Sequence, residues 1–214
     1  MIAVKQLTKS YRTKGGGTLD VFTGLNLEIG TGEFVVIRGP SGCGKTTLLL
    51  ALGGMLRPTS GHIDINGTDI YDLDTRRRAE FRASSIGFVF QMFHLIPYLD
   101  VFENVLLGIC NRSVSGDRDR AKELIERLGI SSRKSHRPSE LSAGERQRAA
   151  IARALINQPK LILADEPTGN LDPDNAAEVV GYLAAYRADG GTVIMVTHGS
   201  AADQVADRVI QMEK

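Results

Sequence analysis

The residues best suited to chemistry form a glycine-rich segment, Gly39-Pro-Ser-Gly-Cys-Gly-Lys-Thr46, which fits the pattern G-x-x-x-x-G-K-[ST]. Its glycines let backbone N–H groups turn toward an anion, at the positive end of the helix expected to follow. Lys45 can reach the β- and γ-phosphates of a nucleotide, and the Thr46 hydroxyl can ligate Mg²⁺. The residues expected to bind the nucleotide here are Gly39, Pro40, Ser41, Gly42, Cys43, Gly44, Lys45, Thr46 and Thr47.

This segment alone does not identify a reaction, because kinases, GTPases and motor proteins all use the same loop. The alternative interpretation is a glycine-rich turn with an incidental lysine. The flanking segments favour phosphate binding, since Glu33–Arg38 reads as a short buried strand and Thr47–Leu52 as a helix. Cys43 lies inside an anion-binding loop, which makes it a candidate for reaction with alkylating reagents.

Two acidic residues and a histidine follow apolar runs farther along the chain. Asp165 and Glu166 come directly after the run Lys160–Ala164. His198 comes directly after the run Thr192–Thr197. Adjacent carboxylates at the end of a buried strand suit Mg²⁺ coordination by the first and activation of water by the second. A lone histidine at a strand end is ordinarily a structural residue, so spacing alone leaves the role of His198 open.

Three further positions could contact a ligand. Gln91 lies at the end of a strand expected at Ile86–Phe90, where ligands of parallel α/β sheets bind. Ser142-Ala-Gly-Glu145 has the pattern of a capping box that opens a long helix over Glu145–Ile156. Tyr11 is either a half-buried aromatic at a strand end or a stacking platform for a nucleobase.

The order of apolar and amphipathic segments indicates an α/β fold. Further strands are expected at Ile2–Val4, Leu25–Ile29 and His62–Gly67, with a loop at Lys14–Gly17. Helices are expected at Asp74–Arg82 and from Gly116, with an apolar stripe of Ala121, Leu124, Ile125 and Leu128 that ends at Gly129. Because polar residues follow the ends of buried strands, we expect a mainly parallel sheet, with residues 93–145 as a helical insertion.

Length and composition limit the class of protein. The 214 residues suffice for one sizeable core, or one core with a small subdomain. A hydrophobic content of 42% and a charged content of 24% are ordinary for a soluble globular protein. The net charge of +1 argues against broad electrostatic attraction to nucleic acid. Because there is no signal-peptide pattern and no apolar run near the roughly 20 residues that span a bilayer, we expect a cytosolic chain unless a partner holds it at a membrane.

Taken together, these motifs resemble the ATP-binding subunit of ABC transporters over nearly the whole chain. The matching segments are Gly39–Thr46 (Walker A), Gln91 (Q-loop), Leu141–Glu145 (signature motif), Leu161–Glu166 (Walker B with its catalytic glutamate), Asn170–Asp172 (D-loop), His198 (switch histidine) and Tyr11 (adenine-stacking aromatic). Three stretches, Val89–Pro97, His136–Ser142 and Leu163–Asp172, resemble the lipoprotein-releasing and macrolide-exporting subclass, to which a cell-division ATPase is close.

The resemblance implies a P-loop NTPase of the RecA-like type that hydrolyses ATP with Mg²⁺. It implies one ABC ATPase domain over residues 1–214: a core with an N-terminal antiparallel β subdomain (1–92 and 146–214) and a helical subdomain (93–145). Catalytic roles fall on Glu166, His198 and Lys45, and metal binding on Thr46, Gln91 and Asp165. Nucleotide contacts beyond the phosphate loop fall on Tyr11, Gln91, Ser142, Ala143, Gly144 and Glu145.

The resemblance also implies partners. Two copies are expected to pack head to tail around two Mg-ATP, with an integral membrane permease at the cytoplasmic face of the inner membrane; no nucleic-acid partner is expected. The alternative is a non-transporting ATPase that regulates a membrane complex in cell division or at the cell wall. A small P-loop kinase is disfavoured because it needs no second phosphate-facing helix. A DNA-repair relative would need a long coiled-coil insertion, and a translation-factor relative two such domains.

Three features depart from the family pattern. Ala143 stands where glycine is usual, Gly199 follows the histidine where an acid is common, and the chain stops at Lys214, so a final strand or helix is expected to be missing. The apolar run Met92–Leu99 is too dense for a solvated loop. We expect part of it to pack under the helical insertion and the rest, including Leu95, to receive a cytoplasmic helix of the membrane subunit.

Overall fold

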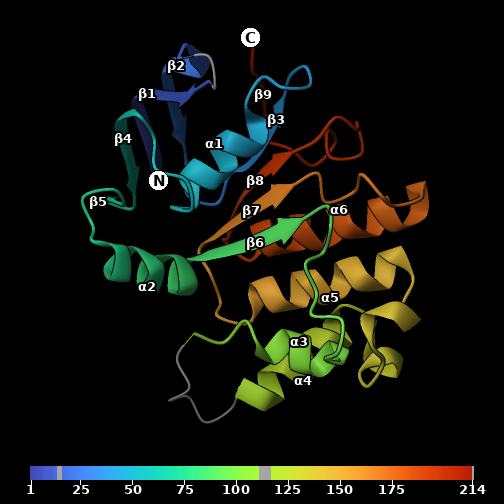
Figure 1. Ribbon diagram of the computed structural model, residues 1–214. Helices are drawn as coiled ribbons and strands as arrows, with labels where there is room; N and C mark the ends of the chain where they lie inside the picture. Colours follow the sequence, from blue (N-terminus) through green and yellow to red (C-terminus); the bar gives the residue numbers. More distant parts are fainter. Residues whose placement is uncertain (14–15, 111–116, 214) are drawn as a thin grey trace.

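Two β-sheets and the helices around them make up the fold (Figure 1). This computed structural model describes residues 1–13, 16–110 and 117–213. The strands are β1 (Ile2–Arg12), β2 (Thr18–Ile29), β3 (Phe34–Arg38), β4 (Ser60–Ile65), β5 (Thr68–Asp69), β6 (Ile86–Phe90), β7 (Leu161–Asp165), β8 (Thr192–Val196) and β9 (Arg208–Gln211). The helices are α1 (Lys45–Leu52), α2 (Thr75–Ser85), α3 (Val101–Leu106), α4 (Asp117–Arg127), α5 (Ala143–Leu155) and α6 (Pro173–Ala188), with short 3-10 helices η1 (Ser131–Arg133) and η2 (Pro138–Glu140).

The larger sheet runs in the order β6-β7-β8-β3-β9, and every neighbouring pair is parallel. Side chains alternate between its faces: Phe34 and Val36 of β3 pack in one apolar cluster, and Val35 and Ile37 in another. The first cluster is shared with α5 and α6, and the second with α1 and the smaller sheet. The predicted mainly parallel sheet is confirmed, and burial on both faces explains why its strands are continuous apolar runs.

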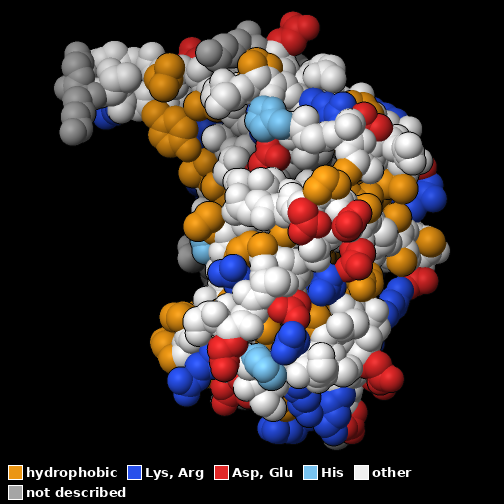
Figure 2. Space-filling model, turned by 90° about the vertical axis from the view of Figure 1, so that its right-hand side faces the viewer, with side chains coloured by type: hydrophobic (Ala, Val, Ile, Leu, Met, Phe, Trp, Pro, Cys, Tyr) orange, Lys and Arg blue, Asp and Glu red, His pale blue; other side chains and the backbone are white. Residues whose placement is uncertain are grey.

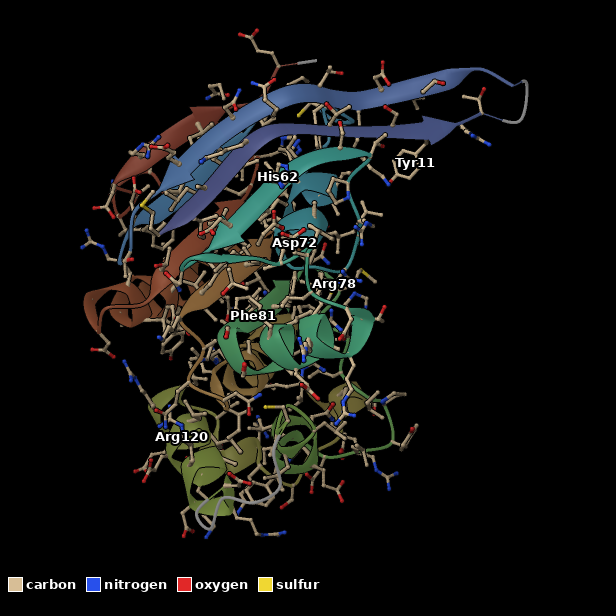
Figure 3. The ribbon with its side chains drawn as sticks, turned by 90° about the vertical axis from the view of Figure 1, so that its left-hand side faces the viewer. Tyr11, His62, Asp72, Arg78, Phe81 and Arg120 are labelled. Atoms are coloured by element: carbon tan, nitrogen blue, oxygen red, sulfur yellow. The ribbon has the colours of Figure 1, made fainter. Side chains whose placement is uncertain are left out.

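The smaller, antiparallel sheet runs in the order β2-β1-β4-β5. Its first two strands are much longer than the predicted Ile2–Val4 and Leu25–Ile29. Their pairing shifts register at several points between Val4 and Ser10, and such bulges break the two-residue alternation by which strands are recognised in a sequence. The paired ends project as an arm (Figure 3). The predicted loop at Lys14–Gly17 lies partly outside the described residues.

Capping side chains set the starts of two helices. The Ser142 hydroxyl accepts the N–H of Glu145, and the Glu145 carboxylate accepts the N–H of Ser142, as the capping box predicted. Because the cap precedes the helix, α5 begins at Ala143 rather than at the predicted Glu145. Asp74 caps α2 through its carboxylate, so it lies before that helix and not within it.

Residues 93–145 contain α3, α4, η1 and η2, and their described part contains no strand. The predicted apolar stripe is buried: Ala121, Leu124, Ile125 and Leu128. Gly129 has a φ of 67°, the left-handed conformation expected where a helix ends. Gly116, where the helical pattern was expected to begin, lies outside the described residues.

The apolar run after Gln91 divides differently from the expectation. Leu95 is partly buried and packs against the apolar cluster that contains Phe34 and Val36, to which α3 and α4 also contribute. Its assignment to the docking face is therefore corrected. Met92 and Tyr98, in contrast, are 69% and 71% exposed.

Two strands, the short β5 and the C-terminal β9, were not predicted. β9 pairs in parallel with β3 and forms the edge of the larger sheet. Most of its side chains are exposed, which is why it lacks the apolar run that marks the other strands. None of the helices in the described ranges is both long enough and apolar enough to cross a bilayer.

Candidate active site

A cavity of about 640 Å³ opens where β3, β6, β7 and β8 end at one edge of the parallel sheet. Figure 2 shows the molecule hollowed beneath the projecting arm, with hydrophobic side chains on the arm's underside. The predicted residues that line the cavity are Tyr11, Ser41, Gly42, Gly44, Lys45, Thr46, Thr47, Gln91, Glu166 and His198. The fold therefore gathers positions that are up to 187 residues apart at the edge where parallel sheets bind ligands.

The phosphate loop approaches other segments so closely that two of its glycines have no room for a side chain. A Cβ on Gly44 would lie 2.5 Å from Cγ1 of Val21, and the φ of 97° there also favours glycine. A Cβ on Gly39 would lie 2.3 Å from the carbonyl oxygen of Met212. These contacts fix the path of the loop into α1, whose first N–H groups have no helical acceptor and attract anions.

The Lys45 side chain is held by the loop itself. Its ammonium donates to the carbonyl oxygens of Gly39 at 2.9 Å and Pro40 at 3.0 Å, and the residue is only 7% exposed. A positive charge is thus fixed beside the cavity, where it can form a charge-assisted hydrogen bond with a phosphate.

Cys43 does not line the cavity. It is 1% exposed and packs in the apolar cluster beneath the loop. The expectation of an accessible thiol is therefore wrong, while contact of the Cys43 residue with nucleotide through the loop backbone stays a prediction. Cys43 fills the core instead.

Thr46 and Asp165 bring two oxygen donors together. The Thr46 hydroxyl donates to Oδ1 of Asp165 at 3.1 Å. Burial raises the pKa of the Asp165 carboxyl, while the hydrogen bond from Thr46 and the charge of Lys45 act in the opposite direction. Hydroxyl and carboxylate oxygens are ligands that Mg²⁺ prefers, and a cation would favour the ionised form of this buried carboxyl. The donor set therefore fits Mg²⁺ bound together with a nucleotide.

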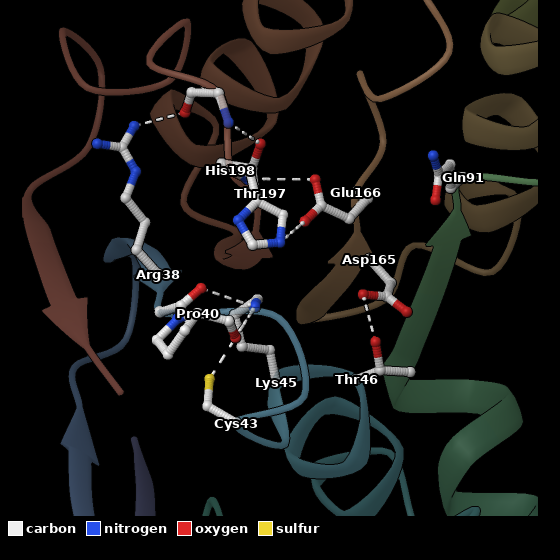
Figure 4. A network of polar contacts seen from close by, with 12 residues as sticks. Arg38, Pro40, Cys43, Lys45, Thr46, Gln91, Asp165, Glu166, Thr197 and His198 are labelled. Carbon is white, nitrogen blue, oxygen red and sulfur yellow. Dashed lines mark hydrogen bonds and ion pairs between the residues drawn. The ribbon is translucent and has the colours of Figure 1, made fainter. Parts of the chain in front are cut away.

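Glu166 and His198 both line the cavity, and their side chains contact each other (Figure 4). The backbone N–H of His198 donates to Oε2 of Glu166 at 3.2 Å, and its Nε2 lies 3.4 Å from Oε1. That Oε1 is buried and has no hydrogen-bond partner among the described residues. The carboxylate is thus oriented through Oε2, while Oε1 keeps an unused acceptor position of the kind that a general base needs. Because Oε1 is buried against the His198 ring, a water molecule can reach it only when that ring moves.

Gln91 lines the cavity but is engaged by the segment after β7. Its Nε2 donates to Oδ1 of Asn170 at 3.2 Å, and Nδ2 of Asn170 donates to the Gln91 carbonyl at 3.3 Å. A Cβ on Gly169 would lie 2.7 Å from Nε2 of Gln91. A metal would contact Oε1 of this amide, which is not the atom that bonds Asn170, so the contact with Asn170 can fix the orientation of Gln91 toward a metal.

Tyr11 belongs to the arm, and its side chain points down from the strands (Figure 3). The residue is 41% exposed. It pairs across the strands with Leu19, which also lines the cavity. The Lys9 ammonium lies 4.8 Å from the centroid of the Tyr11 ring. An aromatic ring with an apolar neighbour, beside a phosphate loop, suits stacking on a nucleobase.

The predicted residues Ser142, Ala143, Gly144 and Glu145 do not line this cavity. Gly144 packs against the start of α6, since a Cβ there would lie 1.9 Å from Oδ1 of Asn175. Arg133 donates to Glu145 at 2.7 Å, and this contact, with the N–H of Ser142, lowers the pKa of the Glu145 carboxyl. Ser142 itself is exposed, so a capped helix start faces away from the chain's own site.

Four lining residues were not predicted: Leu19, Val21, Gly169 and Val196. Leu19 and Val21 alternate along β2, a pattern shared by strands of every kind, so the sequence holds no signal for them. Gly169 precedes the segment that resembles the D-loop, and that resemblance is the only clue to its place beside Gln91.

Known proteins match this chain along its length. A family model described as ABC transporter matches residues 22–169. The chain is 50% identical over 212 residues to the lipoprotein-releasing system ATP-binding protein LolD 1 of Rhodopirellula baltica, covering 97% of this chain and 92% of that protein. It is 42% identical to the macrolide export ATP-binding/permease protein MacB of Bdellovibrio bacteriovorus, covering 99% of this chain but 32% of that longer protein.

A solved structure shares the fold as well as the sequence. The ATP-binding cassette MJ0796, in a dimeric post-hydrolysis state bound to ADP and Pi, has a TM-score of 0.91 and 39% identity, over 99% of this chain and 94% of that one. The expected P-loop fold and the expected subclass are both confirmed. The chain belongs to the ABC transporter family, as an ATP-binding and ATP-hydrolysing domain.

Proposed function

We propose that this chain powers an export or lipoprotein-releasing transporter, and that two copies close head to tail around two Mg-ATP. The observation that carries the proposal is the capped start of α5, whose cap residue Ser142 is exposed and which does not line the chain's own cavity. The hydroxyl of the cap residue Ser142 accepts a hydrogen bond from the N–H of Glu145. The N–H groups of Ala143 and Gly144 have no acceptor within the helix. With the helix dipole they suit the γ-phosphate held by a second copy.

Each side chain of the cavity then has a defined task in hydrolysis. Tyr11 stacks on the adenine, and Lys45 with the N–H groups of its loop binds the phosphates. Thr46, Asp165 and Gln91 would hold Mg²⁺, directly or through water, and the bound ion would supply positive charge to the phosphate oxygens.

Two residues act on the reacting groups. Glu166 orients the attacking water and accepts its proton through Oε1, which has an unused acceptor position and becomes accessible when the His198 ring moves toward the γ-phosphate. His198, which already contacts Glu166, binds the γ-phosphate from the same side.

A membrane partner follows from the helical stretch at residues 93–145, which we treat as a subdomain. Met92, which directly precedes this stretch, and Tyr98 and Leu107 within it expose 69%, 71% and 55% of their surface. Leu107 also lines a groove of about 590 Å³, whose wall holds further apolar residues such as Leu99 and Phe102 together with the charged residues Glu103, Asp117 and Arg118. We propose that this surface takes a cytoplasmic segment of an integral membrane permease, which would hold the chain peripherally at the cytoplasmic face of the inner membrane.

The second candidate function is regulation of a membrane complex without transport. It uses the same ATPase chemistry, so the two differ only in what the membrane partner does. The test is to isolate the chain with its membrane partner and reconstitute both in vesicles, with Glu166→Gln as the inactive control. ATP-dependent lipoprotein release or efflux of a hydrophobic compound, lost with Glu166→Gln, supports the transporter. A partner that stimulates ATPase activity without moving either cargo supports the regulator.

A further inference from the structure

We infer that Arg38 is a positioning residue for ATP hydrolysis, which holds the loop that carries His198. The inference rests on the role proposed above for His198. Arg38 is the last residue of β3 and directly precedes the phosphate loop. Its side chain is 22% exposed and reaches the segment that follows β8 (Figure 4).

The guanidinium of Arg38 holds that segment at two points. Its Nη2 donates to the carbonyl oxygen of Gly199 at 2.5 Å and pairs with the carboxylate of Asp203. A planar guanidinium presents several donors in a fixed geometry, so it can fix a carbonyl and a carboxylate relative to each other. Arg38 thus ties the start of the phosphate loop to the segment after His198.

His198 lies between this anchor and the sheet. On one side, Thr197 donates its N–H to the carbonyl of Ile37 at 3.3 Å and continues the pairing of β3 with β8. On the other side, Gly199 donates its N–H to the Thr197 hydroxyl at 3.0 Å and its carbonyl accepts from Arg38. Glycine gives this position a freer backbone than the acid common in the family. Without Arg38, Gly199 keeps only the hydrogen bond from its N–H to Thr197 among the described residues, and the peptide between Gly199 and Ser200 can rotate.

The chain contains a matched control for this arrangement. Nε of Arg187 donates to the carbonyl of Gly32 at 3.1 Å, and its guanidinium pairs with Asp207. This is the same combination of one carbonyl and one aspartate, but it lies at the opposite end of β3. Arg187→Met therefore removes an equal charge and a similar set of contacts without touching the His198 loop.

The test compares steady-state ATP hydrolysis by Arg38→Met and Arg187→Met. A misplaced catalytic group costs up to about 100-fold, so Arg38→Met should lower kcat by about 10- to 100-fold with little change in KM. Arg187→Met should keep kcat within about twofold of the wild-type value. Arg38→Lys should recover part of the loss, because an ammonium can still pair with Asp203.

The decisive measurement adds Arg38→Met to His198→Ala. If Arg38 acts through His198, the double variant should have a kcat within about twofold of His198→Ala alone. A normal kcat for Arg38→Met, a loss confined to KM, or a full additional loss in the double variant would overturn the inference. If Arg38→Met does not fold, Asp203→Asn tests the same link, and an unchanged kcat there overturns it. A normal kcat for His198→Ala would instead refute the proposed role of His198.

Discussion

Glu166 occupies a backbone conformation that few non-glycine residues adopt, with a φ of 46°. Its N–H donates to the carbonyl of Val196 on the neighbouring strand at 2.9 Å, so the sheet stabilises this conformation. Strain of this kind persists where the surroundings over-determine it, and it turns the carboxylate away from the direction of β7. The backbone, together with the N–H of His198, thus aims the proposed base.

We expect Glu166→Gln to retain ATP binding and to lower turnover by about 10²- to 10⁴-fold, the usual contribution of a positioned base. The amide keeps the size of the side chain but cannot accept the proton from water. Nucleotide binding measured by calorimetry and hydrolysis measured by phosphate release separate the two effects. Glu123→Gln, exposed on α4, is the matched control. A normal rate for Glu166→Gln would show that the general base is another group.

Lys45→Ala should act on binding instead. Its ammonium already lies beside the loop carbonyls, so its charge is present before nucleotide arrives. A hydrogen bond to a charged group contributes about 1.5–3 kcal/mol, so the Kd for ATP should rise by about 10- to 100-fold. Lys122→Ala removes an exposed lysine of α4 and should leave the Kd unchanged. Equal Kd values for the two variants would contradict the assignment of Lys45.

Among the secondary-structure elements, α5 combines the most roles. Its first turn carries the surface proposed for the second nucleotide, and its body packs against β6 and α3. Arg133 of η1 holds Glu145 from outside the helix, so the cap is anchored to the helical subdomain as well as to itself. A change at the cap therefore affects both the stability of this unit and the surface that it presents.

Glu145→Gln separates charge from capping, because glutamine can still accept the N–H of Ser142. The contact with Arg133 and the N–H of Ser142 lower the pKa of Glu145 in the folded protein from its usual 4.5. Its ionised form therefore stabilises the fold above that pH, and this contribution is lost as the pH falls through the folded value. We expect Glu145→Gln to lower the free energy of unfolding by about 1 kcal/mol at pH 7, and by progressively less as the pH falls below 4.5 and through the lowered pKa of the folded state.

Urea denaturation at a series of pH values measures this difference, with Glu123→Gln as the exposed control. A pH-independent loss for Glu145→Gln would mean that glutamine disturbs the cap itself.

At the scale of the whole molecule, the nucleotide cavity of one copy lacks the predicted contacts from residues 142–145. In one copy, Lys45 and Thr46 of the phosphate loop line a single cavity with Gln91 and Glu166, while Ser142 and Gly144 lie outside it. The Glu166→Gln variant, which keeps ATP, should therefore dimerise with Mg-ATP and return to monomer with ADP, as measured by size-exclusion chromatography with light scattering. Adding Lys45→Ala should abolish the dimer. A nucleotide-independent monomer at high concentration would count against the head-to-tail arrangement.

Coupling to the membrane also belongs to the whole molecule. Tyr98→Glu should keep the fold and basal ATPase activity, because the side chain is 71% exposed, but should abolish stimulation by the permease and co-purification with it. Val209→Glu, at a residue 44% exposed on β9, is the matched control. It should leave both stimulation by the permease and co-purification with it unchanged. Leu95→Glu should destabilise the helical subdomain, since Leu95 packs against its core. Normal binding of the permease by Tyr98→Glu would place the docking surface elsewhere.

The sequence by itself determined the features that depend on local chemistry. The phosphate loop, the Asp165-Glu166 pair and the Ser142 cap are recognisable because each needs particular residue types at fixed, short spacing. The parallel sheet was predictable for a similar reason, since burial on both faces makes each strand an apolar run. The resemblance then gave the roles of Gln91 and His198, which spacing alone left open.

Only the tertiary structure decided what depends on packing between distant segments. The long pairing of β1 with β2 escaped prediction because bulges disrupt alternation, and β9 escaped because an exposed edge strand needs no apolar run. Burial of Cys43 and Leu95 depends on which faces meet, and neither face is encoded locally. The link from Arg38 to Gly199 joins residues 161 positions apart. No spacing rule predicts it, because a backbone carbonyl can accept a hydrogen bond whatever its residue type.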